Sequence, residues 1–565
     1  MIDDLVARAL AWADDDPDPV TRDQVISLAE ASRAGDAAAE SRLRSAFDGT
    51  LTFGTAGIRG AMGGGPSRMN RAVVMRAAAG LAEHVRALGG QSVVIGFDAR
   101  HRSDEFAHDA AAVIDGAGLT ALVLPRALPT PVLAYAVLHL GVDAGVMVTA
   151  SHNPAGDNGF KVYLGSGVQI TPPHDAQIAS RIAAIATVKG LPLGDDWTTL
   201  DDSVLNDYLA TAAAVVCEAA PRSLTTVYTP MHGVGGRPFL AVMEAAGFSP
   251  PVVVAEQFEP HAEFPTVPFP NPEEPGAMDL ALAAATRVDA DVVIAHDPDA
   301  DRCAVGVRWG NGHRLLTGDE VGLLLGWWAV ERGRRGWAPA PTGCFATSIV
   351  SSSLLGAIAT DAGLRHQVTL TGFKWIASID DLEYGYEEAL GYCVDPAHVR
   401  DKDGITAGLR VLELIATLKA EGRGAHDVLD EITRRHGVHL TGLLSLRFDH
   451  TAEVTPLMAR LRDSPPTRLG EFIVESAVDL EHGYLDLPPT AGFRYSLGEA
   501  GRVVVRPSGT EPLLKCYVEV VLPARDDIAV TRAEAERQLA AIGATLTELL
   551  ELLELLDGSG RVTMR

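Results

Sequence analysis

The sequence has no long hydrophobic run, few cysteines and little positive charge. Among its 565 residues there is no apolar stretch of about eighteen uncharged residues, and Met1-Ile2-Asp3-Asp4 lacks the basic and apolar regions of a signal peptide. These absences argue against a membrane span and predict a cytoplasmic protein. The five cysteines are scattered and include no CxxC pair, which favours reduced thiols over disulfides or a zinc site.

The charge balance bears on partners. The chain carries 74 acidic and 47 basic residues, a formal net charge of −27. Nucleic acids and anionic membranes require a basic surface, so we expect neither as a partner. An anionic small molecule is still allowed. Salt screens the net charge over about 8 Å, so a local site is governed by its own arginines and lysines.

Short apolar runs alternate with helical stretches along most of the chain. This alternation is typical of parallel sheets in α/β domains, and a hydrophobic content of 47% is ample for several cores. Residues 1–50 are expected to be helical, broken at residues 14–19, and to pack on the first domain as an arm. The expected strands are residues 91–97, 119–124, 144–148, 224–228, 251–255, 291–295, 344–350 and 367–370.

One serine stands on a turn directly after a predicted strand. The hexapeptide Thr149-Ala150-Ser151-His152-Asn153-Pro154 follows the apolar residues 144–148, and Asn158-Gly159-Phe160-Lys161 places a cation about ten residues further on. Open α/β sheets keep their chemistry at the carboxyl ends of their strands. The pattern therefore predicts a reactive hydroxyl, although a capped surface loop has the same composition.

Three carboxylates follow another predicted strand. Asp297-Pro298-Asp299-Ala300-Asp301-Arg302 comes after residues 291–295, and side chains at alternate positions can converge on one hard divalent cation. An EF-hand loop begins in the same way. It is excluded here because Arg302 replaces the required glycine and Arg308 replaces the bidentate glutamate. A solvated acidic turn is the alternative to an open Mg²⁺ site.

A third segment has the composition of a phosphate site. Residues 501–505 lead into Arg506-Pro507-Ser508-Gly509-Thr510-Glu511-Pro512. A guanidinium, two hydroxyls and a glycine that exposes backbone N–H groups suit a phosphate monoester. The alternative is an ordinary turn between strands with a surface arginine.

These three segments, with Phe53-Gly54-Thr55-Ala56-Gly57-Ile58-Arg59-Gly60, resemble the α-D-phosphohexomutase superfamily from about residue 52 to 515. Its members include phosphoglucomutases, phosphomannomutases and phosphopentomutases. The resemblance implies an α/β fold with three similar α/β domains, mixed sheets and a central cleft, followed by a smaller C-terminal α+β domain. We expect the domains at residues 1–210, 211–316, 317–437 and 438–565.

The resemblance also implies the active site. Ser151 would carry phosphate, with one Mg²⁺ held by that phosphoserine and by Asp297, Asp299 and Asp301. Arg59 and His152 lie in motifs that contact the reactive phosphate. Lys161 is a candidate acid or base whose pKa neighbouring cations would lower. The implied substrate-binding residues are Arg302, Gly372, Lys374, Glu387, Ala389, Arg506, Ser508, Gly509 and Thr510.

The expected activity is a phosphosugar mutase. It would exchange phosphate between the 1- and 6-positions of an aldohexose, through phosphoserine and a sugar bisphosphate that acts as intermediate and activator. A phosphopentomutase using the same chemistry is the alternative. A sugar-phosphate phosphatase would not need the second phosphate site, and a non-catalytic binder would not need Ser151 and the aspartates. The protein is expected to be a monomer or a homodimer.

The sugar-reading loop departs from that of the hexose enzymes. Their loop reads Gly-Glu-x-Ser-Gly, whereas this chain has Tyr386-Glu387-Glu388-Ala389-Leu390-Gly391. Glu387 matches, but Ala389 lacks the hydroxyl. Thr371-Gly372-Phe373-Lys374-Trp375 and Asp401-Lys402-Asp403-Gly404 resemble a branch that includes phosphopentomutases and hexose bisphosphate synthases. Lys374 and Trp375 could equally begin a helix that covers the core.

Overall fold

The computed structural model describes residues 2–54, 57–448, 454–508, 513–554 and 561–564, and it divides into two compact units. The first comprises Met1–Leu316 with Gly391–Thr417, and the second comprises Thr317–Leu390 with Leu418–Arg565. Within the described ranges no helix is both long enough and apolar enough to cross a membrane.

The N-terminal arm is a bundle of three helices, α1 (Ile2–Asp15), α2 (Pro19–Arg33) and α3 (Ala37–Ala46). Asp18 caps α2 and Pro19 occupies its first turn, where no amide donor is needed. The arm has its own apolar core. It is tied to the first domain, because Asp15 accepts from the Val188 amide at 3.0 Å and Arg102 donates to Asp18 at 2.6 Å. The predicted packing of the arm is confirmed.

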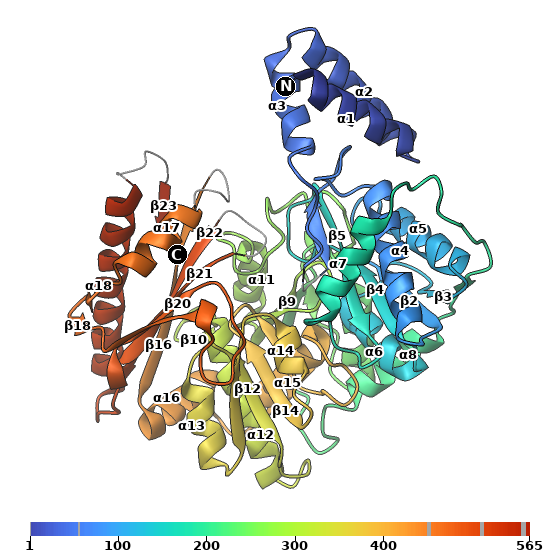
Figure 1. The fold of residues 1–565 in the computed structure, drawn as a ribbon. Helices are drawn as coiled ribbons and strands as arrows, with labels where there is room; N and C mark the ends of the chain where they lie inside the picture. Colours follow the sequence, from blue (N-terminus) through green and yellow to red (C-terminus); the bar gives the residue numbers. More distant parts are fainter. Residues whose placement is uncertain (1, 55–56, 449–453, 509–512, 555–560, 565) are drawn as a thin grey trace. The chain divides into compact units, whose positions relative to one another are not determined.

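A mixed six-stranded sheet forms the first domain, in the order β1-β5-β4-β2-β3-β6 (Figure 1). Strands β4, β2, β3 and β6 run parallel, and β5 and β1 are antiparallel additions at one edge. The bounds are β1 (Ile58–Ala61), β2 (Ser92–Phe97), β3 (Thr120–Val123), β4 (Ala144–Val148), β5 (Asp157–Leu164) and β6 (Thr198–Thr199), with α4 (Arg71–Ala87), α5 (Ser103–Gly116), α6 (Thr130–Leu140), α7 (His174–Ala184) and α8 (Ser203–Ala213).

The second sheet of this unit has the order β11-β10-β9-β7-β8. Strands β9, β7 and β8 are parallel, while β9, β10 and β11 are joined in antiparallel fashion. The bounds are β7 (Thr226–Thr229), β8 (Val252–Val253), β9 (Val292–His296), β10 (Cys303–Trp309) and β11 (Gly312–Leu315), with α9 (Gly236–Ala245), α10 (Ala255–Phe258) and α11 (Asp279–Val288). The first unit also contains strand β15 (Gly391–Cys393) and most of α15 (Gly404–Ala420), although neither is part of this sheet.

The second unit contains a parallel sheet, a large antiparallel sheet and a separate two-stranded antiparallel pair. In the parallel sheet β12 (Cys344–Ser348) lies between β13 (Arg365–Thr369) and β14 (Leu382–Glu387). Its helices are α12 (Gly318–Arg334), α13 (Leu354–Asp361), α14 (Phe373–Ala377) and α16 (Ala425–His436). Thr317 and Glu320 form a capping box that begins α12.

The antiparallel sheet has the order β19-β20-β21-β22-β16-β23. Its elements are β16 (Val438–Arg447), β19 (Ser476–Asp479), β20 (Phe493–Ser496), β21 (Gly501–Pro507), β22 (Leu513–Leu522) and β23 (Arg561–Met564), with α17 (Val454–Asp463), the long α18 (Ile528–Glu554), the short pair β17 (Arg468–Leu469) and β18 (Phe472–Ile473), and the 3₁₀ turns η2 (Leu480–His482) and η3 (Gly498–Ala500). Helix α18 packs on β16 and β22 over an apolar core.

The predicted α/β class is confirmed, and each predicted strand corresponds to a strand of the structure. Buried strands such as β4 and β9 can be predicted from the sequence because their residues form apolar runs. All residues of both strands are buried, and only the terminal His296 is polar. The exact domain boundaries stay a prediction.

Candidate active site

The serine turn lies at the carboxyl end of the buried strand β4. Ser151 adopts a left-handed backbone conformation with φ of 52° and is 4% exposed. Such a conformation is costly for a residue with a side chain and persists only where its surroundings enforce it. The Ser151 amide donates to Thr149 Oγ1 at 2.9 Å. Its hydroxyl lies 3.0 Å from Asp297 Oδ2 and 3.3 Å from His152 Nδ1.

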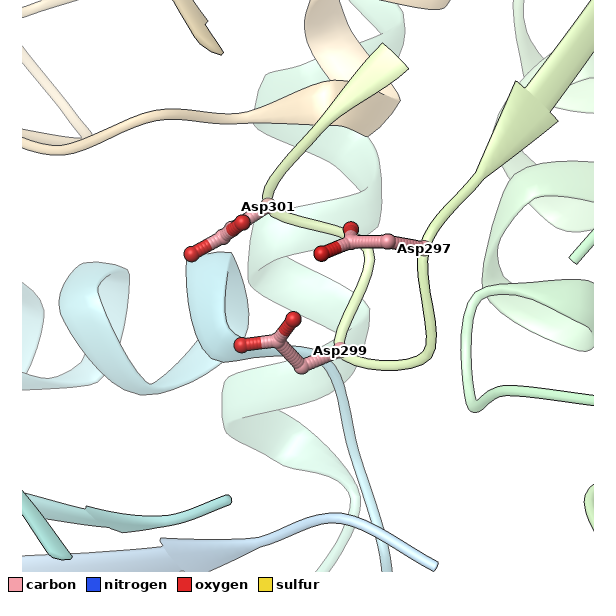
Figure 2. A group of neighbouring side chains, drawn as sticks. All are labelled: Asp297, Asp299 and Asp301. Carbon is pink, nitrogen blue, oxygen red and sulfur yellow. The ribbon is translucent and has the colours of Figure 1, made fainter. Parts of the chain in front are cut away.

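The acidic loop joins β9 to β10 and brings its three carboxylates together. Oxygen atoms of Asp297, Asp299 and Asp301 all lie within 4.8 Å of one another, and all three residues are at most 1% exposed. Figure 2 shows the three side chains turned toward a common space. Asp299 Oδ1 and Asp301 Oδ1 are buried without a hydrogen-bond partner. Buried acceptors of this kind fit a hard divalent cation, so the residues present are suited to hold a metal.

Neighbouring backbone gives this loop its shape. Ala300 has φ of 53°, and its amide donates to the Asp297 carbonyl at 2.9 Å. The segment that follows β7 is hydrogen-bonded to this loop, since the Val234 amide donates to the Pro298 carbonyl at 2.8 Å. A Cβ atom on Gly233 would lie 2.4 Å from Pro298 Cα, so only glycine fits there.

Lysines from two distant segments balance the carboxylates. Lys161 Nζ donates to Asp299 Oδ2 at 2.7 Å and to Asp301 Oδ2 at 3.0 Å. Lys402 Nζ lies 3.3 Å from Asp301 Oδ2. Thr130, at the start of α6, donates its hydroxyl to Asp299 Oδ2 at 2.7 Å. Neither Lys402 nor Thr130 is among the residues predicted from the sequence, although Lys402 stands in the distinctive run Asp401-Lys402-Asp403-Gly404.

Burial and charge pull the pKa values of these groups apart. Burial, and then the adjacent Asp299 and Asp301, raise the pKa of Asp297 well above its ordinary value. For Asp301, burial is outweighed by Lys161, Lys402 and Arg302, which lower the pKa of its carboxyl. The expected lowering of the Lys161 pKa is wrong for this structure. Burial and, to a smaller extent, Lys402 oppose its protonation, but Asp299 and Asp301, which accept hydrogen bonds from the amine, outweigh them and raise its pKa.

The remaining predicted residues of this unit lie near the serine turn or the acidic loop. Arg59 on β1 is the register partner of Gly159 on β5, and β5 is the neighbour of β4. Close backbone approach holds this edge together, since a Cβ on Gly57 would lie 1.9 Å from the Phe160 carbonyl oxygen. Arg302 Nε lies 3.8 Å from Asp301 and 3.9 Å from Asp297. One unit therefore brings together all predicted catalytic and metal-binding residues.

The predicted sugar-reading residues lie in the second unit. Glu387 ends β14, and Ala389 follows in a turn in which Leu390 has φ of 63°. Lys374 is buried in the short helix α14, which begins at Phe373, directly after Gly372. Sequence reasoning missed the adjacent Glu388.

Glu388 anchors the turn that contains Glu387 and Ala389. Its carboxylate accepts from the hydroxyls of Ser348 and Ser351, both at 3.1 Å, and its amide donates to Ser351 Oγ at 3.0 Å. These hydrogen bonds fix Glu388, which lies between Glu387 and Ala389 in the chain.

The phosphate segment is described in part. Arg506 lies near the end of β21, and the Ser508 amide donates to the Leu513 carbonyl at 2.8 Å. Both residues are partly exposed. Gly509 and Thr510, the other two predicted phosphate ligands, lie outside the described residues.

Family models for phosphoglucomutase/phosphomannomutase match the chain in sequence order. The α/β/α domains I, II and III match residues 50–189, 206–310 and 317–436, and the C-terminal domain matches residues 490–535. A protein named probable phosphomannomutase from Haemophilus influenzae is 43% identical over 458 residues, which cover 80% of this chain and 93% of that protein.

Other relatives carry pentose names. One from Schizosaccharomyces pombe, named probable phosphoribomutase, is 35% identical and covers 90% of this chain and 92% of its own length. Among solved structures, a phosphoglucomutase/phosphomannomutase family protein from Burkholderia thailandensis matches with a TM-score of 0.67 at 21% identity, over 89% of this chain and 97% of that one. That likeness concerns the fold.

Proposed function

Because the chain belongs to the phosphoglucomutase/phosphomannomutase family, we propose that it is a phosphosugar mutase that moves phosphate between the 1- and 6-positions of an aldohexose. One observation carries the proposal. The hydroxyl of Ser151, on a left-handed turn, lies 3.0 Å from a carboxylate of a buried group of three aspartates. This pairing of nucleophile and cation ligands suits transfer of a phosphoryl group.

In the proposed reaction Ser151 carries phosphate in the resting enzyme. Transfer breaks the bond between phosphorus and Ser151 Oγ and forms a bond between phosphorus and a free hydroxyl oxygen of the sugar phosphate, whose proton leaves to a base. The resulting bisphosphate turns over in the site. Ser151 Oγ then takes the other phosphate, and the sugar leaves with its phosphate moved.

Asp297, Asp299 and Asp301 would hold one Mg²⁺ together with the phosphoserine. A phosphate on Ser151 adds nearly two negative charges beside three carboxylates, so the two buried oxygens without hydrogen bonds, on Asp299 and Asp301, are suited to a cation. When bound, the cation stabilises the charge that develops on the transferring phosphoryl group. Lys161, Arg59 and His152 are proposed to orient that group and its acceptor hydroxyl, with Lys161 the proposed acid or base.

The second unit would supply substrate recognition. We propose that Arg506, Ser508, Gly509 and Thr510 hold the phosphate that is not reacting. Glu387, Ala389, Gly372 and Lys374 would face the sugar, and Arg302 would bind substrate from the acidic loop of the first unit. The protein's cytoplasmic location and its monomeric or dimeric state remain predictions.

Phosphopentomutase activity is the second candidate. Ala389 lacks the hydroxyl that the hexose enzymes place at this position, and several relatives are named phosphopentomutase or phosphoribomutase. A pentose has fewer hydroxyls to satisfy and would lose less from this absence.

A panel of glucose, mannose, ribose and deoxyribose 1-phosphates, assayed with Mg²⁺ and the matching bisphosphate, tests both candidates. Turnover of the hexose phosphates with a competent kcat/KM supports the first proposal, and a preference for the pentose phosphates supports the second. Release of inorganic phosphate without isomerisation would overturn both.

A further inference from the structure

One buried arginine holds the backbone of the serine turn. Arg100 follows β2 and is 4% exposed. Its Nη2 donates to the carbonyls of Ser151 at 2.5 Å and Asn153 at 2.6 Å, and its Nη1 donates to those of Pro154 at 2.8 Å and Asp157 at 3.2 Å. Each Nη atom has two hydrogens, so these four carbonyls take all four.

The guanidinium is also fixed from outside the turn. Its central carbon lies 5.0 Å from the centroid of the Phe264 ring, which belongs to the loop after α10. Its Nε lies 3.4 Å from Asp98 Oδ2, and both side chains are 1% exposed. Arginine suits this arrangement, because a lysine ammonium has only three hydrogens and cannot donate one to each of four carbonyls.

Asp98 fixes the other side of the same turn. Its carboxylate accepts from Thr149 Oγ1 at 2.6 Å and from Ser103 Oγ at 2.7 Å. Thr149 Oγ1 in turn accepts from the Ser151 amide at 2.9 Å. The amide of Ser151 is thus held through Thr149 by Asp98, and its carbonyl is held by Arg100.

We propose that Arg100 and Asp98 are positioning residues for phosphotransfer, which hold Ser151 in its left-handed conformation with its hydroxyl against the acidic loop. The inference rests on the proposed function. It assigns to Arg100 a role different from that expected of an arginine near a reactive phosphate. Its Nη hydrogens all bind backbone carbonyls of the turn. Arg100 therefore affects the reaction by positioning Ser151, and not by binding the phosphate itself.

The role predicts an effect on kcat rather than on KM. A displacement of about 1 Å at a reacting group can lower the rate about 100-fold. We therefore expect Arg100→Lys to lower kcat by about 10- to 100-fold, to leave KM within about threefold, and to slow phosphorylation of Ser151 by the sugar bisphosphate in rapid-quench mass spectrometry. Arg71→Lys is the matched control and should retain wild-type kcat, because it changes an arginine of α4 that pairs with Asp109 on α5.

Thr149 offers a second test at constant shape. Thr149→Val keeps the side-chain volume but loses the hydroxyl, and should lower kcat about tenfold or more. Thr149→Ser keeps the hydroxyl and should restore most of the rate at a similar unfolding midpoint. This pair keeps the inference testable if Arg100→Lys does not fold.

The outcomes separate the two proposals. A wild-type protein with no mutase activity and no phosphate on Ser151 would overturn the proposed function. An active wild type whose Arg100→Lys and Thr149→Val variants match it would overturn the positioning role alone. A tenfold rise in KM with unchanged kcat in Arg100→Lys would also overturn it, because Arg100 would then bind substrate.

Discussion

The serine and acidic loops of the first unit differ from the sugar and phosphate segments of the second in how their atoms are fixed. Around Ser151 and the three aspartates, buried groups from distant segments meet at hydrogen-bond distance. In the second unit the predicted residues that the structure describes are mostly half-exposed, and Glu388 anchors the turn that contains Ala389. Reaction chemistry needs fixed atoms, whereas substrate choice can change through one exposed side chain.

Removing the proposed nucleophile should lower the rate more than any other change. If it did not, the first unit would not be where the chemistry takes place. We expect Ser151→Ala to lower kcat by about 10⁴-fold or more, because alanine removes the proposed phosphoryl acceptor. Intact mass and peptide mapping should show phosphate on Ser151 in the wild type and none in the variant. Ser166→Ala, an exposed serine of the same domain, is the control. Phosphate on another residue, or retained turnover, would contradict the mechanism.

Weakening the cation site should have the next largest effect. We expect Asp299→Asn to lower kcat by about 10²- to 10³-fold and to weaken Mg²⁺ binding, because one of the three proposed carboxylate ligands is lost. Mg²⁺ should raise the unfolding midpoint of the wild type, as a ligand of the folded state does, and raise that of the variant less. Asp289→Asn, at an exposed aspartate, is the control. Full wild-type activity in EDTA would refute the assignment.

The second unit also has a buried anchoring carboxylate, and its stability should depend on pH. Glu519 accepts from the hydroxyls of Ser352 and Ser353, both at 3.0 Å, and pairs with Arg502 at 3.1 Å. Burial opposes its ionisation, but Arg502 and His439 lower the pKa of Glu519 to about 2. A pKa lowered on folding stabilises the fold above the unfolded value of about 4.5, and this contribution is lost as pH falls toward 2.

We expect Glu519→Gln to lose about 3 kcal/mol of unfolding free energy at pH 7, the size that this pKa difference implies. The gap between variant and wild type should narrow as pH falls from 5 to 3. Urea unfolding across this range measures it, with Glu499→Gln at an exposed site as the control. A gap that is constant with pH would mean that the ionisation of Glu519 does not stabilise the fold.

The smallest expected effect is that of Ala389→Ser, which tests whether the second unit determines substrate choice. A serine hydroxyl hydrogen-bonded to a hexose contributes about 0.5 to 1.5 kcal/mol, or up to about tenfold in binding. Ala389→Ser should therefore raise kcat/KM for glucose 1-phosphate relative to ribose 1-phosphate by up to that factor, with glucose and mannose phosphates staying within about tenfold of each other. A flat or falling ratio would show that Ala389 does not read the sugar.

The sequence predicted the parts of this fold that depend on local pattern. Strands β4 and β9 were visible as apolar runs, and the Ser151 turn and the acidic loop were visible because each follows such a run. Lys402, Thr130 and Arg100 were not predicted. Each acts on a residue between about 50 and 170 positions away along the chain, and local spacing holds no information on such contacts.

The surroundings of Lys161 show the same limit. The motif gave its position, but the sign of its pKa shift depends on which charges face it. Those charges lie 138 and 140 residues further along the chain. Its environment could therefore be found only from the folded structure.

The ties between Lys161, Lys402, Thr130 and the acidic loop have a consequence for exchanging parts among relatives. The segment at residues 50–189 supplies Thr130 and Lys161, and the segment at residues 206–310 supplies the aspartates that they contact. A chimaera that takes these two segments from different parents would combine contacting side chains that did not evolve together. In a recombination experiment the two segments should therefore come from the same parent. Residue 402 should come from that parent too, because Lys402 pairs with Asp301.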